Sequence, residues 1–204
     1  MLKCDVRKYF FNINNDIIYR LISRKIKDKK VLELTKEFIY HNEDSVGVPI
    51  GNYTSQYYAN IYLNELDKYV KHELKLKYFV RYMDDWVILF KTKEEAKEAL
   101  QKITIFLREE LKLELNSKTN YFQVNQGASF CGYRIWPTHM LLRDQSKKRM
   151  KRRMKIFQKL YRDNRITIEE ITKSVMSWWG HVIHCNSHML ICRIFDQYRF
   201  SRSK

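Results

Sequence analysis

Tyr82-Met83-Asp84-Asp85 is the stretch that decides the fold, because it stands between two short runs of strand-forming residues. Residues 78–81 lead into it and residues 86–90 lead out, and both runs are rich in the aromatic and β-branched side chains that favour strands. The tetrapeptide therefore falls at the tip of a predicted β-hairpin. Two adjacent carboxylates between apolar strands cost free energy unless something neutralises them, and a divalent cation is a usual partner.

A third carboxylate, Asp5, lies in another strand-like run near the N-terminus, over residues 2–7. Paired Asp residues plus one distant Asp are how phosphoryl-transfer enzymes hold two Mg²⁺ ions. We therefore expect Asp5 and Asp84 to hold both ions and Asp85 to support them. The alternative is a solvated turn, since an Asp-Asp pair is common in turns.

The composition indicates a globular chain with a polyanionic partner. The 204 residues include 45% hydrophobic residues, 5 Gly and 2 Pro, which argues against disorder and against an all-β fold with many turns. The formal net charge is +16 and the pI is about 9.6, which favours nucleic acid as the partner over a membrane. A basic solvated surface is the alternative interpretation.

The sequence predicts a cytoplasmic protein without membrane segments. No stretch approaches the ~20 apolar residues that a membrane span needs, and charged residues interrupt the N-terminus, which excludes a signal peptide. The four Cys have no CxxC spacing, which is typical of reduced thiols.

Residues 2–143 alternate between predicted strands and helices. Asn15 or Asp16 could cap a first helix, and Thr92-Lys93-Glu94-Glu95 forms a capping box at the start of another. The predicted helices cover residues 15–27, 30–42, 54–72 and 92–113, with a loop at 43–51 and strands at 119–124, 129–135 and 140–143. This order predicts an α/β or α+β sheet domain.

The composition changes at residue 144. Residues 143–162 carry ten Lys or Arg and one acid, and apolar residues recur there at three- and four-residue spacing: Met150, Met154, Phe157 and Tyr161. A second capping box at Thr167 predicts a helix toward Trp178. We therefore expect a catalytic domain over residues 1–143 and a small basic helical domain over 144–204.

The hairpin motif resembles that of reverse transcriptases, the RNA-directed DNA polymerases. The resemblance implies an α+β right-hand polymerase palm, an antiparallel sheet with helices, followed by a small helical thumb. It also implies catalytic carboxylates at Asp5, Asp84 and Asp85 and nucleotide contacts from Tyr82 and Met83. The implied metal ligands are Asp5, Val6, Asp84 and Asp85.

Residues 5–11 resemble the first catalytic strand of that family, in which an aromatic residue blocks a ribonucleotide's 2′-hydroxyl. Phe10 would take this role here; the alternative is that Phe10 is an ordinary core residue.

Residues 47–56, Gly-Val-Pro-Ile-Gly-Asn-Tyr-Thr-Ser-Gln, resemble the family's loop and helix start that pack on the nascent base pair. Most reverse transcriptases have Gln at the position of Ile50 and Ser-Pro where this chain has Ser55-Gln56. An aliphatic residue with Ser-Gln resembles the diversity-generating retroelement type, which copies a template-repeat RNA with errors at adenines. Nucleotide contacts are implied for Ile50, Gly51 and Gln56, and Gly51 would permit close backbone approach. The alternative is a tight turn with Ile50 in the core.

Three later segments are also similar to the family. Lys118, in residues 116–119, is implied as a catalytic Lys near the leaving pyrophosphate. Residues 130–133 resemble the family's primer-grip hairpin, and Cys131, Gly132 and Tyr133 are implied as the primer grip. The basic helix resembles the thumb, and the implied phosphate contacts come from Lys147, Lys148, Arg149, Lys151, Arg152 and Arg153. A zinc site at His181, His184, Cys185 and His188 is the alternative for the segment after Trp179.

The resemblance implies two Mg²⁺ ions, replaceable by Mn²⁺, together with a template RNA, a DNA or RNA primer, dNTPs and a small basic accessory variability protein. It implies a bacterial or phage-encoded retroelement enzyme. The family's fingers segment would precede Asp5, so we expect this chain alone to be weakly active or inactive while still binding nucleic acid. The alternatives are a group II intron or retron type enzyme and an inactive nucleic-acid-binding remnant.

Overall fold

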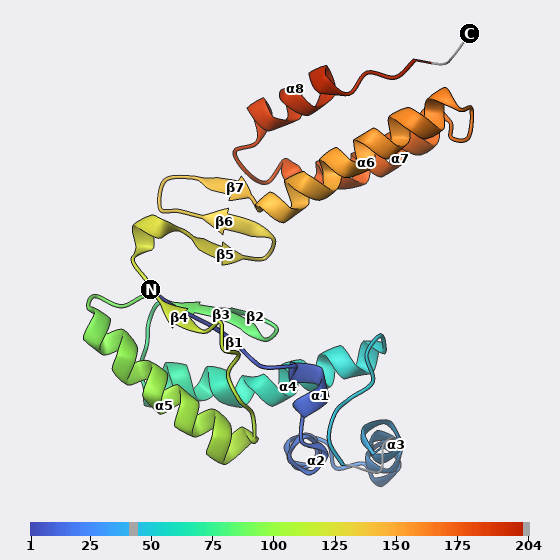
Figure 1. Ribbon diagram of the computed structural model, residues 1–204. Coiled ribbons are helices and arrows are strands. Elements are labelled where there is room, and N and C mark those ends of the chain that lie inside the picture. The colour runs from blue at the N-terminus through green and yellow to red at the C-terminus, as the bar shows by residue number, and fades with distance from the viewer. Residues whose placement is uncertain (41–44, 202–204) are drawn as a thin grey trace. The chain divides into compact units, whose positions relative to one another are not determined.

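The computed structural model describes residues 1–40 and 45–201, which form two compact units, Met1–Gln123 and Val124–Lys204. Each unit has its own sheet and helices (Figure 1). Each also has its own buried apolar residues, in one large cluster in the first unit and two small clusters in the second. The mixture of helices with antiparallel sheets confirms the predicted α+β class.

The first unit is built on a four-stranded antiparallel sheet in the order β2-β3-β1-β4. Its strands are β1 (Leu2–Asp5), β2 (Phe79–Tyr82), β3 (Asp85–Ile88) and β4 (Asn120–Tyr121). Helices α4 (Tyr53–Lys68) and α5 (Lys93–Leu111) cover one face (Figure 1). Strand β1 alternates as predicted: Leu2 and Cys4 are fully buried, while Lys3 and Asp5 lie half-exposed on the other face.

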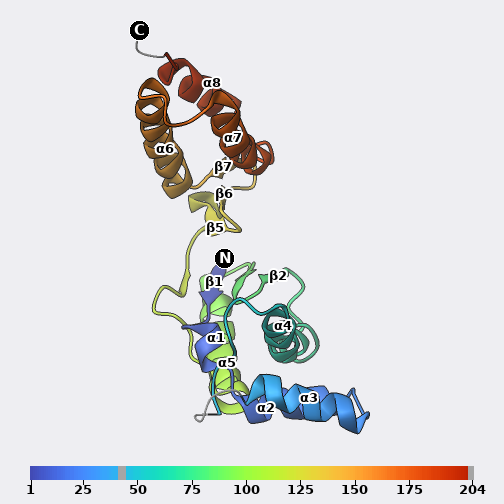
Figure 2. The same ribbon diagram turned by 90° about the vertical axis from the view of Figure 1, so that its right-hand side faces the viewer.

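Four shorter helical segments complete this unit: α1 (Tyr9–Asn12), α2 (Asn15–Ser23), α3 (Lys29–Ile39) and a π-helical turn, Tyr69–Glu73. Helices α2 and α3 lie side by side (Figures 1 and 2). One large apolar cluster includes Tyr62, Leu66, Trp86 and Ile103, all fully buried, and fixes the sheet against α4 and α5.

Three predictions for this unit need correction. The cap of α2 is Asn14, whose side chain accepts from the Ile17 amide, because Asn15 is buried and donates to the Ile39 carbonyl instead. The helix ends at Ser23 rather than near residue 27. Strand β1 ends at Asp5, so Phe10 lies on α1 rather than on the strand. The predicted helix end at residue 42 and the loop residues 43–44 lie outside the described residues.

The second unit combines a three-stranded antiparallel sheet, in the order β5-β6-β7, with three helices. Its elements are a 3₁₀ turn (Val124–Gln126), β5 (Ala128–Phe130), β6 (Tyr133–Ile135), β7 (Met140–Leu142), α6 (Asp144–Arg162), α7 (Ile168–Val182) and α8 (His188–Gln197). The predicted apolar stripe of α6 is confirmed, because Met150 and Met154 are buried and Phe157 and Tyr161 pack beside them. Both predicted capping boxes are present, at Thr92 and Thr167.

The predicted single strand at 129–135 is wrong, whereas the hairpin implied by the resemblance at residues 130–133 is confirmed. Cys131 and Gly132 have positive φ angles of 48° and 88°, so the chain turns there and makes the β5–β6 hairpin. The compact units divide at residues 123/124, whereas the composition changes at 144. The physical reason is that Leu142 of β7 packs with Val182 and Ile191, which joins this sheet to the C-terminal helices. Assignment of palm and thumb roles to 1–143 and 144–204 stays a prediction.

None of the described helices is both long and apolar enough to cross a membrane. Within residues 1–40 and 45–201, no disulfide joins the cysteines.

Candidate active site

The strand register brings the motif residues into one row. Asp85 of β3 lies opposite Asp5 of β1 on one side and opposite Tyr82 of β2 on the other. Directly opposed residues in an antiparallel pair share a face of the sheet, so these three side chains lie on the face opposite α4 and α5. The sheet thereby joins carboxylates that are 80 positions apart in the sequence.

Met83 and Asp84 form the two-residue turn between β2 and β3. Met83 has φ 54°, in the left-handed region that an L side chain rarely adopts. The Val6 amide donates to the Asp84 carbonyl at 3.2 Å, which ties the turn to β1 beside Asp5. Val6 therefore lies in the site through its backbone, while its side chain is buried.

Two carboxylates of the row are held by polar partners. The Lys3 Nζ donates to both Asp85 oxygens, at 2.7 and 2.9 Å, and these side chains are 23% and 30% exposed. The Asn116 Nδ2 donates to the Asp5 Oδ2 at 3.0 Å, and the Asn116 amide donates to the Asp5 carbonyl at 2.7 Å. Asp85 is thus paired with a cation, while Asp5 has a neutral partner.

Burial and neighbouring carboxylates raise the pKa of both Asp5 and Asp84. Burial raises the pKa of Asp5 above its usual value, and repulsion by Asp84 and Asp85 raises it further, against the opposing effects of Asn116 and Lys3. Burial also raises the pKa of Asp84, with a contribution from Asp85, while a backbone hydrogen bond opposes the shift. Crowded carboxylates with raised pKa values favour a bound cation, which would relieve both effects.

The donor set fits a metal at two of the predicted ligands. Within residues 1–40 and 45–201, no three or more His, Cys, Asp or Glu side chains are arranged so that they could hold one metal ion. Asp5 and Asp84 are the oxygen ligands left for a hard cation such as Mg²⁺, because Asp85 is paired with Lys3. The same finding argues against the alternative zinc site around His181.

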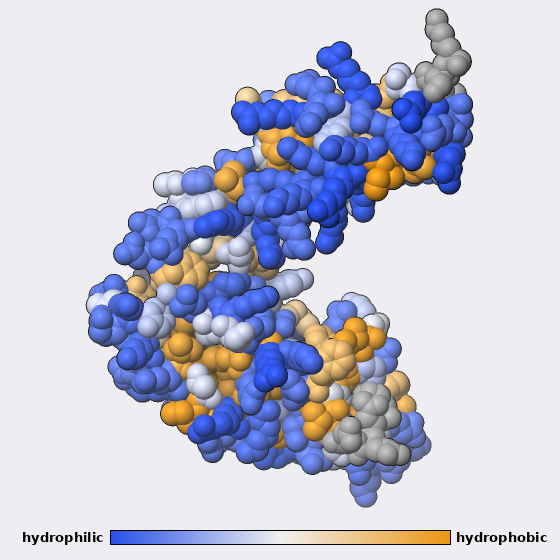
Figure 3. All heavy atoms as spheres, in the orientation of Figure 1, coloured by the Kyte–Doolittle hydropathy of each residue, from blue (hydrophilic) through white to orange (hydrophobic). Residues whose placement is uncertain are grey.

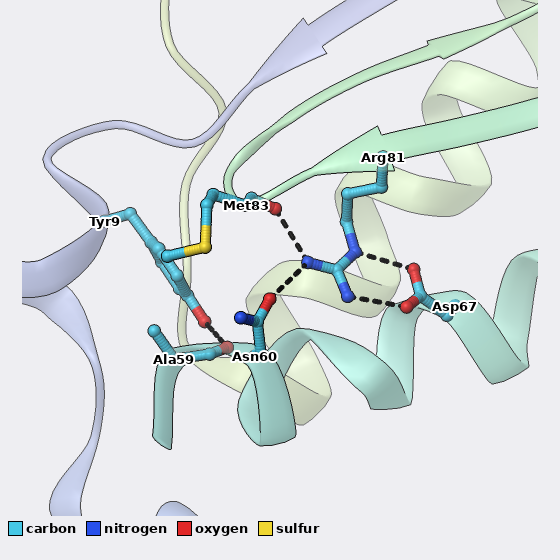
Figure 4. A network of polar contacts seen from close by, with 6 residues as sticks. All are labelled: Tyr9, Ala59, Asn60, Asp67, Arg81 and Met83. Carbon is cyan, nitrogen blue, oxygen red and sulfur yellow. Dashed lines mark hydrogen bonds and ion pairs between the residues drawn. The ribbon is translucent and has the colours of Figure 1, made fainter. Parts of the chain in front are cut away.

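Sequence reasoning missed three further residues at the site: Lys3, Arg81 and Asp67. The position of Lys3 could have been predicted from the sequence, because strand alternation puts residues 3 and 5 on one face. The ion pair between Arg81 of β2 and Asp67 of α4, at 2.6 Å, could not have been predicted, because it depends on how the helix packs against the sheet (Figure 4). Asn116 lies in the segment 116–119 that resembles the family, but the sequence predicted no role for it.

Phe10 lies where α1 meets the loop before α4. It is partly buried against the core, and its carbonyl accepts from the Val48 amide at 2.9 Å. The Gly47 amide donates to the Ile13 carbonyl at 2.7 Å, so the loop is held along α1. Gly47 has φ 90°, and a Cβ there would lie 3.3 Å from the Phe11 carbonyl oxygen, so this glycine makes the close approach.

Ile50 is 66% exposed, so the alternative that it fills the core is wrong. Gly51 has φ 100°, and no atom of the described residues lies within 4 Å of a Cβ position there, so its predicted close approach to a base pair stays a prediction. Gln56 and Lys118 are exposed, and the Lys118 amide donates to the Asn116 side chain at 3.1 Å.

The predicted primer grip forms the β5–β6 turn of the second unit. Cys131 is exposed, and the Tyr133 hydroxyl donates to the His181 carbonyl at 2.7 Å while the two rings stack at 4.6 Å. A Cβ on Gly132 would lie 3.0 Å from the His181 ring, which explains the need for glycine. His181 is therefore a packing partner of this turn.

The basic residues of α6 cover its solvent side, and the visible face over this helix is mostly hydrophilic (Figure 3). One shallow hollow along the helix is lined by Gln145, Lys148, Arg149, Arg152, Arg153 and Ile156. Lys151 is also exposed, whereas Lys147 pairs with Asp144 at 3.0 Å and Arg153 donates to Ser174 at 3.2 Å. The predicted phosphate contacts thus lie on one exposed helix.

Comparison with known proteins relates the chain to intron-encoded proteins. It is 28% identical over 203 aligned residues to the group II intron-encoded protein LtrA of Lactococcus lactis subsp. cremoris, covering 64% of this chain and 34% of LtrA. It is 24% identical to the putative COX1/OXI3 intron 2 protein of Saccharomyces cerevisiae, covering 66% and 23%. It is 26% identical to Escherichia coli protein YkfC, covering 66% and 46%. The chain thus spans less than half the length of these relatives.

Residues 1–135 match the family model described as reverse transcriptase (RNA-dependent DNA polymerase). This match covers the row of Asp5, Asp85 and Tyr82, the Met83-Asp84 turn, the loop before α4 and the β5–β6 hairpin. The chain belongs to the reverse transcriptase family.

Proposed function

We propose that this chain carries out RNA-templated DNA synthesis by two-metal nucleotidyl transfer. The observation that carries the proposal is the convergence of Asp5 and Asp84, two carboxylates with raised pKa values, in a chain of this family. Asp5, Asp84 and the Val6 backbone would hold Mg²⁺, or Mn²⁺ in its place. Of the two ions, one would activate the primer 3′-hydroxyl for attack on the dNTP α-phosphorus, and the other would neutralise charge on the triphosphate and the leaving pyrophosphate.

The chain's own residues would orient the reactants. Lys3 fixes Asp85 as a supporting carboxylate, and Asn116 fixes Asp5. Phe10 would exclude the 2′-hydroxyl of a ribonucleotide by its bulk, and Tyr82 and Met83 would contact the nucleotide. Lys118 would add positive charge near the pyrophosphate.

The proposed partners are a template RNA, a DNA or RNA primer and dNTPs. Cys131, Gly132 and Tyr133 would seat the primer end, and the exposed cations of α6 would follow a duplex through its phosphates without reading sequence. The proposed setting is the cytoplasm of a bacterium, with the gene carried by the host or a phage.

Within this activity we propose error-prone copying of a template-repeat RNA, as in diversity-generating retroelements, with a small basic accessory protein as a further partner. Exposed Ile50 and Gln56 support it, because an aliphatic side chain beside the nascent pair offers fewer hydrogen bonds than Gln and would hold it less strictly. A group II intron type enzyme is the second candidate, favoured by the relatives' names.

Single-turnover primer extension tests the reaction. The chain is held in excess over a DNA primer annealed to an RNA template, with dNTPs and Mg²⁺ or Mn²⁺. We expect slow extension that EDTA and Asp5→Asn abolish and that Asp196→Asn, an exposed change on α8, leaves intact. Extension that survives Asp5→Asn would refute the site. Duplex binding without extension by the unaltered chain would favour the inactive remnant.

Sequencing of the extension products tests the finer proposal. We expect frequent misincorporation opposite template adenines and fewer such errors with Ile50→Gln. Ile61→Gln on α4 is the matched control, because Ile61 is also exposed but is not in the loop. Accurate copying of adenines by the unaltered chain would favour the group II intron type.

A further inference from the structure

Arg81 joins the catalytic hairpin to helix α4. Its Nε donates to the Asp67 Oδ1 at 2.7 Å and its Nη2 to the Asp67 Oδ2 at 2.6 Å, a bidentate pair (Figure 4). The Arg81 side chain is 11% exposed and that of Asp67 24%. A bidentate guanidinium–carboxylate pair with so little solvent contact is fixed in direction as well as in charge.

The third nitrogen of the guanidinium reaches the turn itself. The Arg81 Nη1 donates to the Met83 carbonyl at 2.8 Å and to the Asn60 Oδ1 at 3.4 Å. Helix α4 thereby supplies Asp67 and Asn60 as anchors, and the fork they orient holds a backbone carbonyl of the turn (Figure 4).

Both peptide groups that flank Asp84 are held by hydrogen bonds. Arg81 holds the Met83–Asp84 peptide through the Met83 oxygen, and the Val6 amide holds the Asp84–Asp85 peptide through the Asp84 oxygen. The Met83 side chain points toward Tyr9, whose hydroxyl donates to the Ala59 carbonyl of α4 (Figure 4). With φ 54° at Met83, the turn carries backbone strain that such contacts must offset.

We propose that Arg81, oriented by Asp67, is a positioning residue that sets the direction of the Asp84 carboxylate. The inference rests on the proposed function, in which Asp84 holds the metal. Lys in place of Arg keeps the charge but has a single nitrogen, which cannot hold both Asp67 oxygens and the Met83 carbonyl in the same plane. A positive charge at this position is therefore insufficient to direct the Asp84 carboxylate, and the planar geometry of the guanidinium is required.

The test compares Arg81→Lys with Arg108→Lys. Arg108 is an exposed α5 residue paired with its neighbour Glu109, so the same chemical change there releases no turn carbonyl. Two quantities are measured: single-turnover extension, and binding of Mn²⁺ alone from the electron paramagnetic resonance signal of the free ion. The second needs no turnover.

We expect Arg81→Lys to lower the extension rate and the Mn²⁺ affinity by about 10- to 100-fold, the range seen when a residue that orients a metal ligand is changed. The primer–template concentration for half-maximal rate should change by no more than about twofold, since the three guanidinium nitrogens of Arg81 are held by Asp67 and the Met83 carbonyl. Arg108→Lys should change neither quantity. Asp67→Asn should cause a similar loss, and adding it to Arg81→Lys should cost little more, because both act through one contact.

Each outcome decides the proposal. Losses that persist at a temperature where circular dichroism shows folded Arg81→Lys support it, and Asp67→Asn replaces that variant if it does not fold. Unchanged rate and Mn²⁺ affinity overturn it, as do losses that vanish when the variant is cooled into its folded state. Mn²⁺ binding without extension by the unaltered chain would count against the proposed function alone. The Mn²⁺ affinity of Arg81→Lys would then still test the role of Arg81. Absence of both would overturn both proposals.

Discussion

The two units of this chain differ in the sign of their clustered charges and in the burial of those charges. In the first unit, the carboxylates lie half-buried on a sheet, and two of them have specific partners: Lys3 for Asp85 and Asn116 for Asp5. In the second, cations stand exposed along α6, over two small apolar clusters. Under the proposed function this difference fits two tasks, because chemistry at a phosphorus atom needs fixed directions, whereas following a phosphate backbone needs charge density on a regular surface.

The sharpest test of this contrast removes one carboxylate from each unit. Asp84→Asn should lower extension by about 10²- to 10³-fold or more, because it removes a charge aimed at the reacting centre. Asp144→Asn makes the same change at an exposed residue of α6 and should leave extension intact. Single-turnover extension measures both. Equal losses would mean that overall charge, rather than placement, controls the reaction.

A core substitution tests whether the small apolar clusters limit the stability of the second unit. Met154 is fully buried between α6 and α7, and Met154→Ala should cost about 2–5 kcal/mol of unfolding free energy. Ile103→Ala, in the large cluster, removes a similarly buried residue from the first unit. Hydrogen exchange by region should show each variant loosening its own unit. Joint loosening of both units by Met154→Ala would contradict independent cores.

Neutralising two cations of α6 should weaken duplex binding uniformly across sequences. Arg149→Gln with Arg152→Gln should reduce the slope of log affinity against log salt by about 2, because each phosphate contact contributes about one released counterion. Lys102→Gln with Lys97→Gln, on exposed α5, is the control and should leave the slope unchanged. Fluorescence anisotropy at several salt concentrations measures it. A sequence-dependent loss would indicate base readout instead.

The raised pKa values predict that ionised Asp84 costs stability. A carboxyl whose pKa rises on folding imposes no cost below its unfolded-state pKa and its full cost above the folded-state pKa. In EDTA, Asp84→Asn should therefore raise the Tm at pH 7, and the gain should shrink as the pH falls toward 4. Mg²⁺ should stabilise the unaltered chain but not the variant. A gain that grows on acidification would show that the shift has the opposite sign.

The two capping boxes provide the smallest and most closely matched comparison. Thr92 and Thr167 each accept from the amide three residues later at 3.2 Å, and each faces a Glu that accepts in return. Thr92→Ala and Thr167→Ala should each cost about 1 kcal/mol. Denaturant titration monitored in each unit should show similar costs. Unequal costs would mean that tertiary contacts, not the caps, hold one of the helices.

The sequence determined the local elements and the identity of the reactive groups. Alternation predicted the faces of β1, two Thr-x-x-Glu boxes predicted the starts of α5 and α7, and the spacing of Met150 and Met154 predicted the buried stripe of α6. These features follow from contacts between near neighbours in the chain, which a periodic pattern encodes directly. The hairpin at Tyr82–Asp85 was predicted for the same reason, whereas the turn within 129–135 was implied by the family resemblance and not by the strand pattern.

Only the tertiary structure decided how the carboxylates are held. It placed Asp5 opposite Asp85, turned Asp85 toward Lys3, left Ile50 exposed and linked Arg81 through Asp67 to the Met83 carbonyl. It also joined β5–β7 to the C-terminal helices, where composition alone had drawn a boundary at 144. These results depend on strand register and helix–sheet packing, which bring together residues distant in sequence, and no local pattern specifies which distant partner a side chain will meet.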